Sequence, residues 1–243
     1  MPVSTFFHTE NRGFVLHDIF NFETAHPADV DEAYHVLNIG NIGNVVYWTR
    51  FLEMVRNVPG AIVECGIGRA RSLLVMAALN KLLDPGEGGG RAIYGYDSFE
   101  GFPEPSPEDA SKRDPKKGDW SHSPSGKYKY DSDFIRTVLD NACITGEIGL
   151  EKGYFTDSLR NYSKEPIALL HVDGDLYESY IDVLNALYPF VCIGGVIVFD
   201  DFMYNAPPDE KWPGARKAVD EFFHGTGQTL RESIRGNPYI IKS

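Results

Sequence analysis

Two apolar segments of this chain each end abruptly in a pair of acids. The segment IALLHV (167–172) runs into Asp173 and Asp175, and GGVIVF (194–199) runs into Asp200 and Asp201. Clustered carboxylates repel one another unless a positive charge lies between them. A hard divalent cation such as Mg²⁺ prefers oxygen ligands and supplies that charge. The pattern therefore favours a metal or catalytic site.

The alternative for each acid is an ordinary structural role. A single Asp after a strand is more often a turn residue or a helix cap than a ligand. Neighbouring strands lie about 5 Å apart. If these two strands pair, we expect Asp173, Asp200 and Asp201 to converge on one point. Asp175 is left between two roles, as a further ligand or as the residue that positions the following turn.

A glycine turn follows an earlier apolar run, in the segment VECGIGRARS (63–72). Gly66 and Gly68 permit close approach of a ligand to the backbone, and the next helix begins with free amide groups. Arg71 stands where a dinucleotide-binding fingerprint has its third glycine or alanine. That departure argues against NAD.

Two acids flank this turn. Glu64 precedes it and is placed to receive a cationic amino group, and Asp97 ends the next predicted strand, where it is placed to bind the ribose hydroxyls. A plain turn residue in YDSFEG is the alternative for Asp97. Together the residues suit a nucleoside that bears an ammonium group better than a pyrophosphate.

Three further polar or aromatic residues are candidates for the site. His171 shares a strand face with Asp173 but sits deeper, which favours a core histidine over a catalytic one. Trp120 and His122 lie in a long loop and are candidate substrate contacts, with an exposed loop position as the equal alternative. The three cysteines have no metal-ligand spacing, which favours packing roles and reduced thiols.

The elements that would position these residues alternate along the chain. Residues 101–130, rich in Pro, Gly, Ser and charge, form a long loop of the kind that is functional or disordered. Periodicity and turn residues predict helices over 44–58, 72–84, 133–143, 180–191 and 215–223, strands over 60–68, 91–97, 149–155, 167–172 and 194–199, and a C-terminal hairpin around Gly236 and Asn237. This order predicts an α/β fold, a doubly wound, mostly parallel sheet whose ligands bind at the carboxyl ends of its strands.

Composition narrows the function classes. With 243 residues the chain suits one domain, and its formal net charge of −12 disfavours a nucleic-acid partner. No apolar run approaches the roughly 18 residues of a membrane span, and the N-terminal residues lack a signal-peptide pattern. We therefore expect a cytoplasmic protein with a small-molecule partner and no membrane contact.

Several segments together resemble the macrocin O-methyltransferase family. They are AIVECGIGRARS, YGYDSFEGFPEP, KGYFTDSL, LLHVDGDLYES, GGVIVFDDF and ARKAVDEF, within residues 60–223. Members of that family use S-adenosylmethionine and Mg²⁺ to methylate hydroxyls of sugars or similar groups on natural products. The resemblance implies a class I methyltransferase, Rossmann-like sheet of seven strands, for which residues 60–243 form the domain and 101–130 a lid-like insertion. Residues 1–59 would be a helical segment that caps the substrate site or makes contacts in a homo-oligomer.

The resemblance also implies roles for particular residues. Asp173, Asp200 and Asp201 would bind the metal, and Asp173 would also be the general base. Catechol-type methyltransferases have a lysine base where this chain has Leu176, so deprotonation by a carboxylate is expected. The cofactor would lie over Glu64, Gly66, Gly68, Ser72, Asp97, Ser98, Phe155, Asp157 and Ser158.

Three other functions are kept as alternatives. An NAD(P)-dependent oxidoreductase would give a change in nicotinamide absorbance on turnover. A metal-dependent phosphate hydrolase would use the acid cluster without an organic cofactor. A non-catalytic domain of the same fold would bind S-adenosylmethionine without methylating any acceptor.

Overall fold

A computed structural model describes residues 39–83, 90–123, 126–142, 144, 148–163, 165–205 and 211–243. Within these ranges the chain forms a seven-stranded sheet in the order β3-β2-β1-β4-β5-β7-β6. The strands are β1 (Ala61–Cys65), β2 (Ile93–Asp97), β3 (Ile148–Lys152), β4 (Ile167–Val172), β5 (Val191–Phe199), β6 (Arg231–Glu232) and β7 (Pro238–Ile241). The first five run parallel, whereas β7 pairs antiparallel with β5 and β6 antiparallel with β7. The predicted parallel sheet with a C-terminal hairpin is confirmed.

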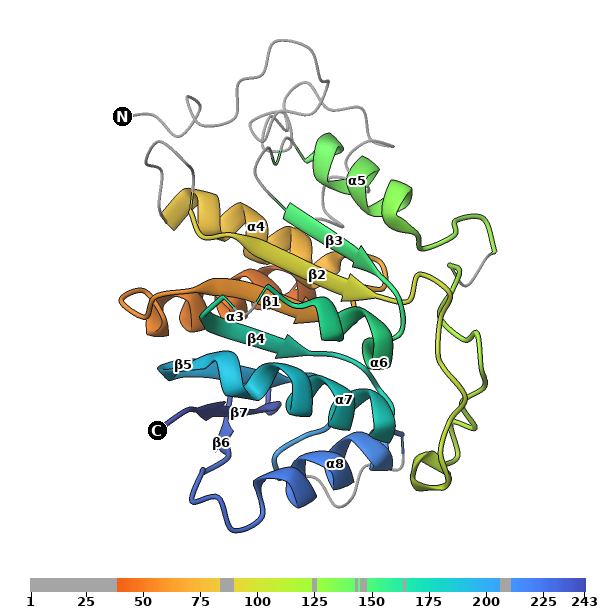
Figure 1. Ribbon diagram of the computed structural model, residues 1–243. Helices are drawn as coiled ribbons and strands as arrows, with labels where there is room; N and C mark the ends of the chain where they lie inside the picture. The colour runs from red at the N-terminus through yellow and green to blue at the C-terminus, as the bar shows by residue number, and fades with distance from the viewer. Residues whose placement is uncertain are drawn as a thin grey trace.

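Helices cover both faces of the sheet (Figure 1). On one face, residues of α3 (Ile39–Met54), α4 (Arg71–Leu83) and α5 (Ser132–Asn141) join one core cluster. On the other face, residues of α7 (Tyr177–Leu187) and α8 (Pro213–Phe223) join a second cluster, with α6 (Phe155–Ser158) beside them. Short 3₁₀ turns complete the elements at η2 (Pro107–Asp109), η3 (Leu159–Asn161) and η4 (Tyr188–Phe190). The expected doubly wound arrangement is therefore present.

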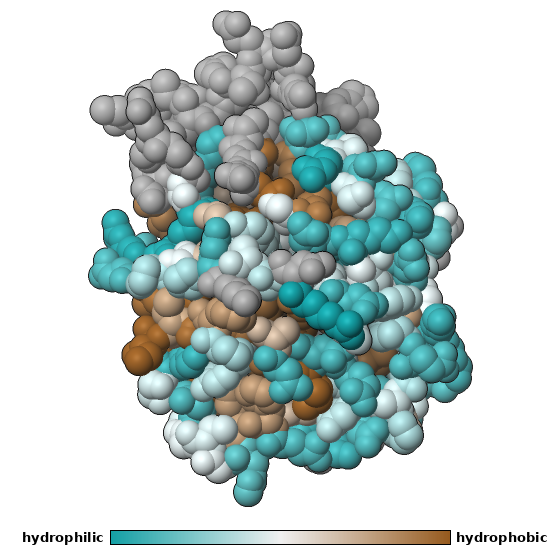
Figure 2. Space-filling view, in the orientation of Figure 1, coloured by the Kyte–Doolittle hydropathy of each residue, from teal (hydrophilic) through white to brown (hydrophobic). Residues whose placement is uncertain are grey.

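The buried strands contribute side chains to the core clusters on both faces of the sheet. In β1 every residue is buried, because Val63 and Cys65 face one core cluster while Ile62 faces the other. Near-continuous apolar runs of this kind are typical of parallel strands covered on both faces. The face shown in Figure 2 is mostly hydrophilic, with apolar residues visible only in patches.

Some predicted boundaries differ from the structure. The strand expected to continue to Phe155 ends at Lys152, because Gly153 takes a positive φ of 147° and Phe155 opens α6. The first predicted helix begins earlier, at Ile39, and ends at Met54. Its Tyr47, Trp48 and Phe51 are buried against the sheet, so α3 packs with the domain that follows it. Residues 1–38, part of the predicted N-terminal segment, and Cys143 lie outside the described ranges.

Register brings the predicted acids to one edge. Val172 of β4 pairs with Phe199 of β5, so Asp173 and Asp200 leave neighbouring strands at the same level. Cys65 of β1 pairs with Val172 on the other side, which places Gly66 beside Asp173. Among the described helices, none is long and apolar enough to cross a membrane.

Candidate active site

A cavity of about 580 Å³ opens at the carboxyl edge of the sheet. Its wall brings together the turns that follow β1, β2, β4 and β5, the start of α6 and part of the long loop. This is the edge at which open α/β sheets bind their ligands. Of the predicted site residues, the cavity wall includes Gly66, Gly68, Ser72, Asp97, Ser98, Trp120, Phe155, Asp173, Asp200 and Asp201.

Glycine is needed at the two positions of the β1 turn, Gly66 and Gly68, for different physical reasons. Both take positive φ, 96° at Gly66 and 51° at Gly68. A Cβ atom on Gly66 would lie 1.8 Å from the carbonyl oxygen of Asp173, whereas one on Gly68 would meet nothing within 4 Å. Gly66 is therefore required by the close approach of the β4 turn. Gly68 keeps open space on the ligand side, the role that sequence reasoning assigned to both.

Asp97 organises the glycine turn through its carboxylate. One oxygen accepts hydrogen bonds from the amides of Ile67 and Gly68, at 2.8 and 3.0 Å, and the other accepts from the amide of Phe99 at 2.7 Å. A carboxylate offers about four acceptor positions, so about one remains. Asp97 can thus receive one ligand hydroxyl while it holds the turn, rather than the two ribose hydroxyls expected from the sequence.

Glu64 lies beneath the turn and is not part of the cavity wall. Its Oε1 is 2.9 Å from Nδ1 of His171, and both side chains are fully buried. Burial raises the pKa of the Glu64 carboxyl, and the hydrogen bond from His171 opposes that shift. His171 is thus a core histidine with a partner, as the sequence favoured, and Glu64 supports the turn from below.

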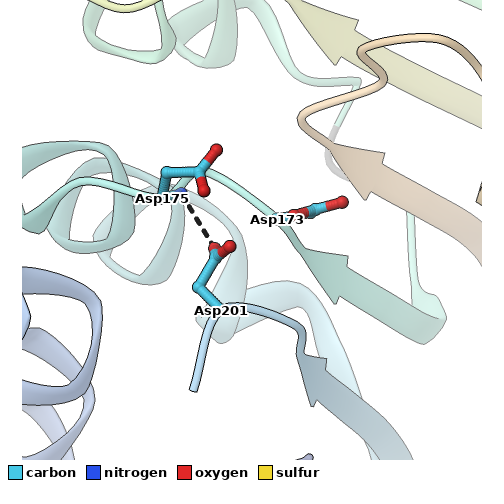
Figure 3. A group of neighbouring side chains, drawn as sticks. All are labelled: Asp173, Asp175 and Asp201. Atoms are coloured by element: carbon cyan, nitrogen blue, oxygen red, sulfur yellow. Dashed lines mark hydrogen bonds between the residues drawn. The ribbon is translucent and has the colours of Figure 1, made fainter. Parts of the chain in front are cut away.

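Asp173, Asp175 and Asp201 form a compact group of acids (Figure 3). Each offers a carboxylate oxygen, and these oxygens all lie within 4.8 Å of one another. Asp201 Oδ2 accepts hydrogen bonds from the amide of Asp175 and the hydroxyl of Tyr180, both at 2.8 Å. Asp175 takes a positive φ of 59°, which turns its amide toward Asp201.

Asp200 lies in the same cavity wall but outside this compact group. Burial raises the pKa of the Asp173 carboxyl well above its ordinary value, and the charge of Asp200 adds more to that shift than the charge of either Asp201 or Asp175 alone. Burial also raises the pKa of Asp201, and Asp200 is again the leading charge. The acids therefore make one electrostatic unit.

This donor set fits a hard divalent cation. The carboxylates converge from two neighbouring strand ends, and each is destabilised in its charged form by burial and by the others. A cation between them would reverse that repulsion. The wall beside the group also fits a nucleoside cofactor, because Gly68 leaves open space next to the free acceptor position of Asp97.

The remaining predicted residues divide into two sets. Ser72, Ser98, Phe155 and Trp120 line the cavity, and Trp120 is 44% exposed. Asp157, Ser158 and His122 do not line it. Ser158 donates to the carbonyls of Gly153 and Tyr154, Asp157 points to solvent beside Arg160, and His122 bonds Ser121.

Sequence reasoning missed several cavity residues. Asn44 comes from α3, Lys211 and Trp212 precede α8, and Arg235 comes from the turn between β6 and β7. Each comes from a segment whose return to the cavity depends on packing of the whole chain. The sequence predicted the helix that contains Asn44 and the hairpin next to Arg235, but not that either reaches the cavity.

The first half of the 101–130 loop is anchored to the domain. The buried Asp109 accepts hydrogen bonds from the amide and hydroxyl of Ser106, and from the amide of Tyr177 at the start of α7. Phe102 packs edge-on against Trp212, with ring centroids 5.5 Å apart. The loop therefore reaches the cavity from a fixed base.

The strand order and the antiparallel last strands define the fold of the class I methyltransferases. The calicheamicin methyltransferase CalS11 shares it with a TM-score of 0.73 at 24% identity, over 93% of this chain and 90% of that one. The O-methyltransferase NovP shares it with a TM-score of 0.66 at 27% identity, over 82% and 79% of the two chains.

The sequence itself gives the family. The family description for macrocin O-methyltransferase (TylF) matches residues 50–232, and this chain belongs to that family. It is 32% identical over 167 residues to the demethyldecarbamoylnovobiocin O-methyltransferase of Streptomyces niveus, covering 68% of this chain and 59% of the relative. It is 27% identical over 192 residues to the mycinamicin III 3''-O-methyltransferase of Micromonospora griseorubida, covering 76% and 70%. The chain thus spans less than two thirds of the length of the first of these relatives.

Proposed function

We propose that this protein transfers a methyl group from S-adenosylmethionine to a hydroxyl of a sugar or a similar natural-product acceptor, with Mg²⁺ as its metal. The single observation that carries the proposal is that the glycine turn and the acid cluster share one cavity. Membership of the macrocin O-methyltransferase family supports it, as do the names of the relatives, which methylate oxygens of novobiocin and mycinamicin intermediates.

The cofactor would lie along the turns after β1 and β2. Gly68 would leave room for it, Asp97 would accept one ribose hydroxyl, and Ser72, Ser98 and Phe155 would line its remaining surface. Glu64 would act through the turn that it supports, and Asp157 and Ser158 through the position of Phe155. S-adenosylmethionine supplies the activated methyl group.

The metal would be held by Asp173, Asp200 and Asp201. Asp200 is included among the metal ligands because its charge has the largest effect of any charge on the pKa values of Asp173 and Asp201. Asp175, rather than Asp200, belongs to the compact group of carboxylates. A metal ion held there would supply positive charge that favours loss of the proton from an acceptor hydroxyl. Asp173 would accept that proton, because the register of β1 and β4 places this residue beside Gly66 of the glycine turn.

Ligand counting narrows the acceptor. Mg²⁺ takes about six oxygen ligands, and three carboxylates supply about half of them. An acceptor with two neighbouring hydroxyls would fill two of the remaining positions. Orientation of that acceptor beside the cofactor would contribute much of the rate gain.

The test is a transfer assay with S-adenosylmethionine, Mg²⁺ and a panel of sugar acceptors, read by mass spectrometry as the gain of one methyl group. Transfer should stop with a chelator and return when Mg²⁺ is restored. A matched acceptor that lacks the neighbouring, unmethylated hydroxyl should react far more slowly. Equal rates for both acceptors, with no effect of chelator, would exclude the metal-chelate mechanism. Failure to bind S-adenosylhomocysteine would exclude the methyltransferase itself.

A further inference from the structure

Three arginines line the same cavity and come from two separate parts of the chain. Arg69 and Arg71 follow the glycine turn at the start of α4, and Arg235 lies in the turn between β6 and β7. All three side chains are exposed at the cavity. Among the described residues, no ion pair joins any of the three to a carboxylate. These three guanidinium groups therefore gather on the α3 side of the cavity without a direct ion pair to a described carboxylate, although the cavity wall as a whole carries more carboxylates than cations.

These arginines are held close to one another. Arg71 donates to the carbonyl of Gly40 at 3.1 Å, and Arg235 donates to Oδ1 of Asn44 at 3.3 Å while lying 4.8 Å from the ring centre of Tyr47. Partial burial lowers the pKa of Arg71, and the charges of Arg69 and then Arg235 lower it further, while the charge of Asp200 has a smaller, opposite effect. Like charges gathered in this way raise the free energy of the empty site and favour a bound anion.

Asn44 gives an independent indication of a ligand at this place. Its side chain is 3% exposed and belongs to the cavity wall. Its Oδ1 accepts from Arg235, but its Nδ2 has no hydrogen-bond partner among the described residues. A buried donor without a partner destabilises the ligand-free site. A ligand oxygen beside Arg235 would satisfy it.

The chemistry of the cluster selects the ligand. The amino-acid part of S-adenosylmethionine carries an ammonium and a carboxylate, so it brings no net negative charge to the three guanidinium groups. A neutral sugar adds none either. Guanidinium groups form bidentate hydrogen bonds with phosphate oxygens, and a phosphate or diphosphate carries net negative charge.

We propose that Arg71, Arg235 and Asn44 bind a phosphate group of the acceptor, so that the substrate class is a sugar carried on a phosphate or a nucleoside diphosphate. The inference rests on the proposed function, because it places this group beside the hydroxyl that would be methylated. The phosphate would occupy the α3 side of the cavity while the sugar hydroxyls reach the acid cluster.

The experiment is calorimetry with uridine diphosphate, with chelator present so that no metal links the probe to the acids. Uridine diphosphate should bind the wild-type protein, pyrophosphate should compete with it, and uridine should not. Arg235→Ala and Arg71→Ala should each weaken binding at least tenfold, and Arg235→Lys should recover part of the loss. Arg231→Ala is the matched control, because Arg231 is exposed on the same hairpin but does not line the cavity; it should bind like wild type.

S-adenosylhomocysteine is titrated into each variant in parallel. Unchanged binding of this ligand to Arg235→Ala, with lost binding of uridine diphosphate, supports the phosphate site. Absence of binding of uridine diphosphate to the wild type, or equal affinity in wild type, Arg235→Ala and Arg71→Ala, overturns it. Weaker binding of S-adenosylhomocysteine alone would assign the arginines to the cofactor carboxylate, which also overturns it. Absence of S-adenosylhomocysteine binding to the wild type would instead refute the proposed function, so the two failures are distinguishable.

Once phosphate binding is established, its source is settled by comparing glucose 1-phosphate with uridine diphosphate glucose as ligands. Tighter binding of the second by tenfold or more supports a nucleoside diphosphate carrier. Equal affinity supports a simple sugar phosphate. Thermal unfolding of each variant confirms that a change in affinity is not a loss of fold.

Discussion

The carbonyl oxygen of Asp173 lies 1.8 Å from the position that a Cβ atom would take on Gly66. The two turns are also joined by a hydrogen bond, since the amide of Asp173 donates to the carbonyl of Cys65 at 2.9 Å. The proposed cofactor turn and the proposed metal strand therefore contact each other through the main chain. A change in one displaces the other.

Gly66→Ala should lower the free energy of unfolding by about 2–5 kcal/mol, because it combines left-handed strain with a clash against backbone. Gly68→Ala, the matched control for strain, should cost only about 1 kcal/mol, since its Cβ meets nothing within 4 Å. Urea unfolding of both variants measures the difference. Equal costs would show that the β4 turn does not restrict position 66.

In metal-free protein, stability should fall as pH rises from about 4 toward neutral and above. The pKa values of the Asp173, Asp175 and Asp201 carboxyls are raised in the folded state by burial and by neighbouring acids. The folded protein then binds more protons than the unfolded chain in this interval, so raising the pH favours unfolding. Thermal unfolding with chelator measures the effect. Asp173→Asn should be the more stable protein at pH 8, by about 1 kcal/mol or more, and stability that rises over the same interval would contradict the prediction.

Asp200→Asn and Asp175→Asn should separate the two candidates for the third metal ligand. If Asp200 is a ligand, its loss should weaken Mg²⁺ binding tenfold or more. Asp175→Asn should weaken it less, because the amide that orients Asp201 belongs to the backbone and survives the change. The increase in melting temperature on addition of Mg²⁺ measures binding to each variant. The reverse order would make Asp175 the ligand.

Asp97→Ala should weaken binding of S-adenosylhomocysteine at least tenfold. The change removes the acceptor for a ribose hydroxyl and also the acceptors for the amides of Ile67, Gly68 and Phe99. Ser98→Ala is a milder comparison, since its hydroxyl bonds within the same turn. Calorimetry measures both variants, and unchanged affinity in Asp97→Ala would remove Asp97 from the cofactor site.

Asp109→Ala should cost about 1–3 kcal/mol and should make residues 101–123 more sensitive to trypsin. Its carboxylate joins the loop to the start of α7, and nothing in an alanine replaces those acceptors. Asp114→Ala is the control, because Asp114 is exposed and pairs only with nearby Lys116 among the described contacts. The same digestion with cofactor and acceptor tests lid closure, which predicts protection. Equal cleavage with and without ligands would make the loop a fixed surface feature.

The sheet could be predicted because each signal was local. Apolar runs marked the strands, amphipathic periods marked the helices, and the acids that end β4 and β5 marked the edge where they meet. The presence of Asp173 and Asp201 in one group follows from parallel pairing alone.

Other parts of the site depend on contacts that local patterns do not contain. The steric need for glycine at position 66 could be predicted only from the register of β1 against β4, which places the Asp173 carbonyl beside it. The three backbone amides that donate to Asp97 could not be predicted without knowing the path of the glycine turn. Arg235 reaches the cavity only because an edge hairpin folds back over α3; the neighbouring Gly236 and Asn237 predict the hairpin but not its packing on α3.

The attachment of the 101–130 loop through Asp109 indicates where this loop could be joined to a loop from another protein in a chimera. Its carboxylate closes the 3₁₀ turn on Ser106 and caps α7, and Gly214 leaves the space that this carboxylate fills. A segment transplanted between residues 113 and 130 would keep that anchor and replace only the part of the loop that carries Trp120. Under the proposed function, acceptor preference should then be exchangeable by grafting, while the sheet edge that holds the acids stays untouched.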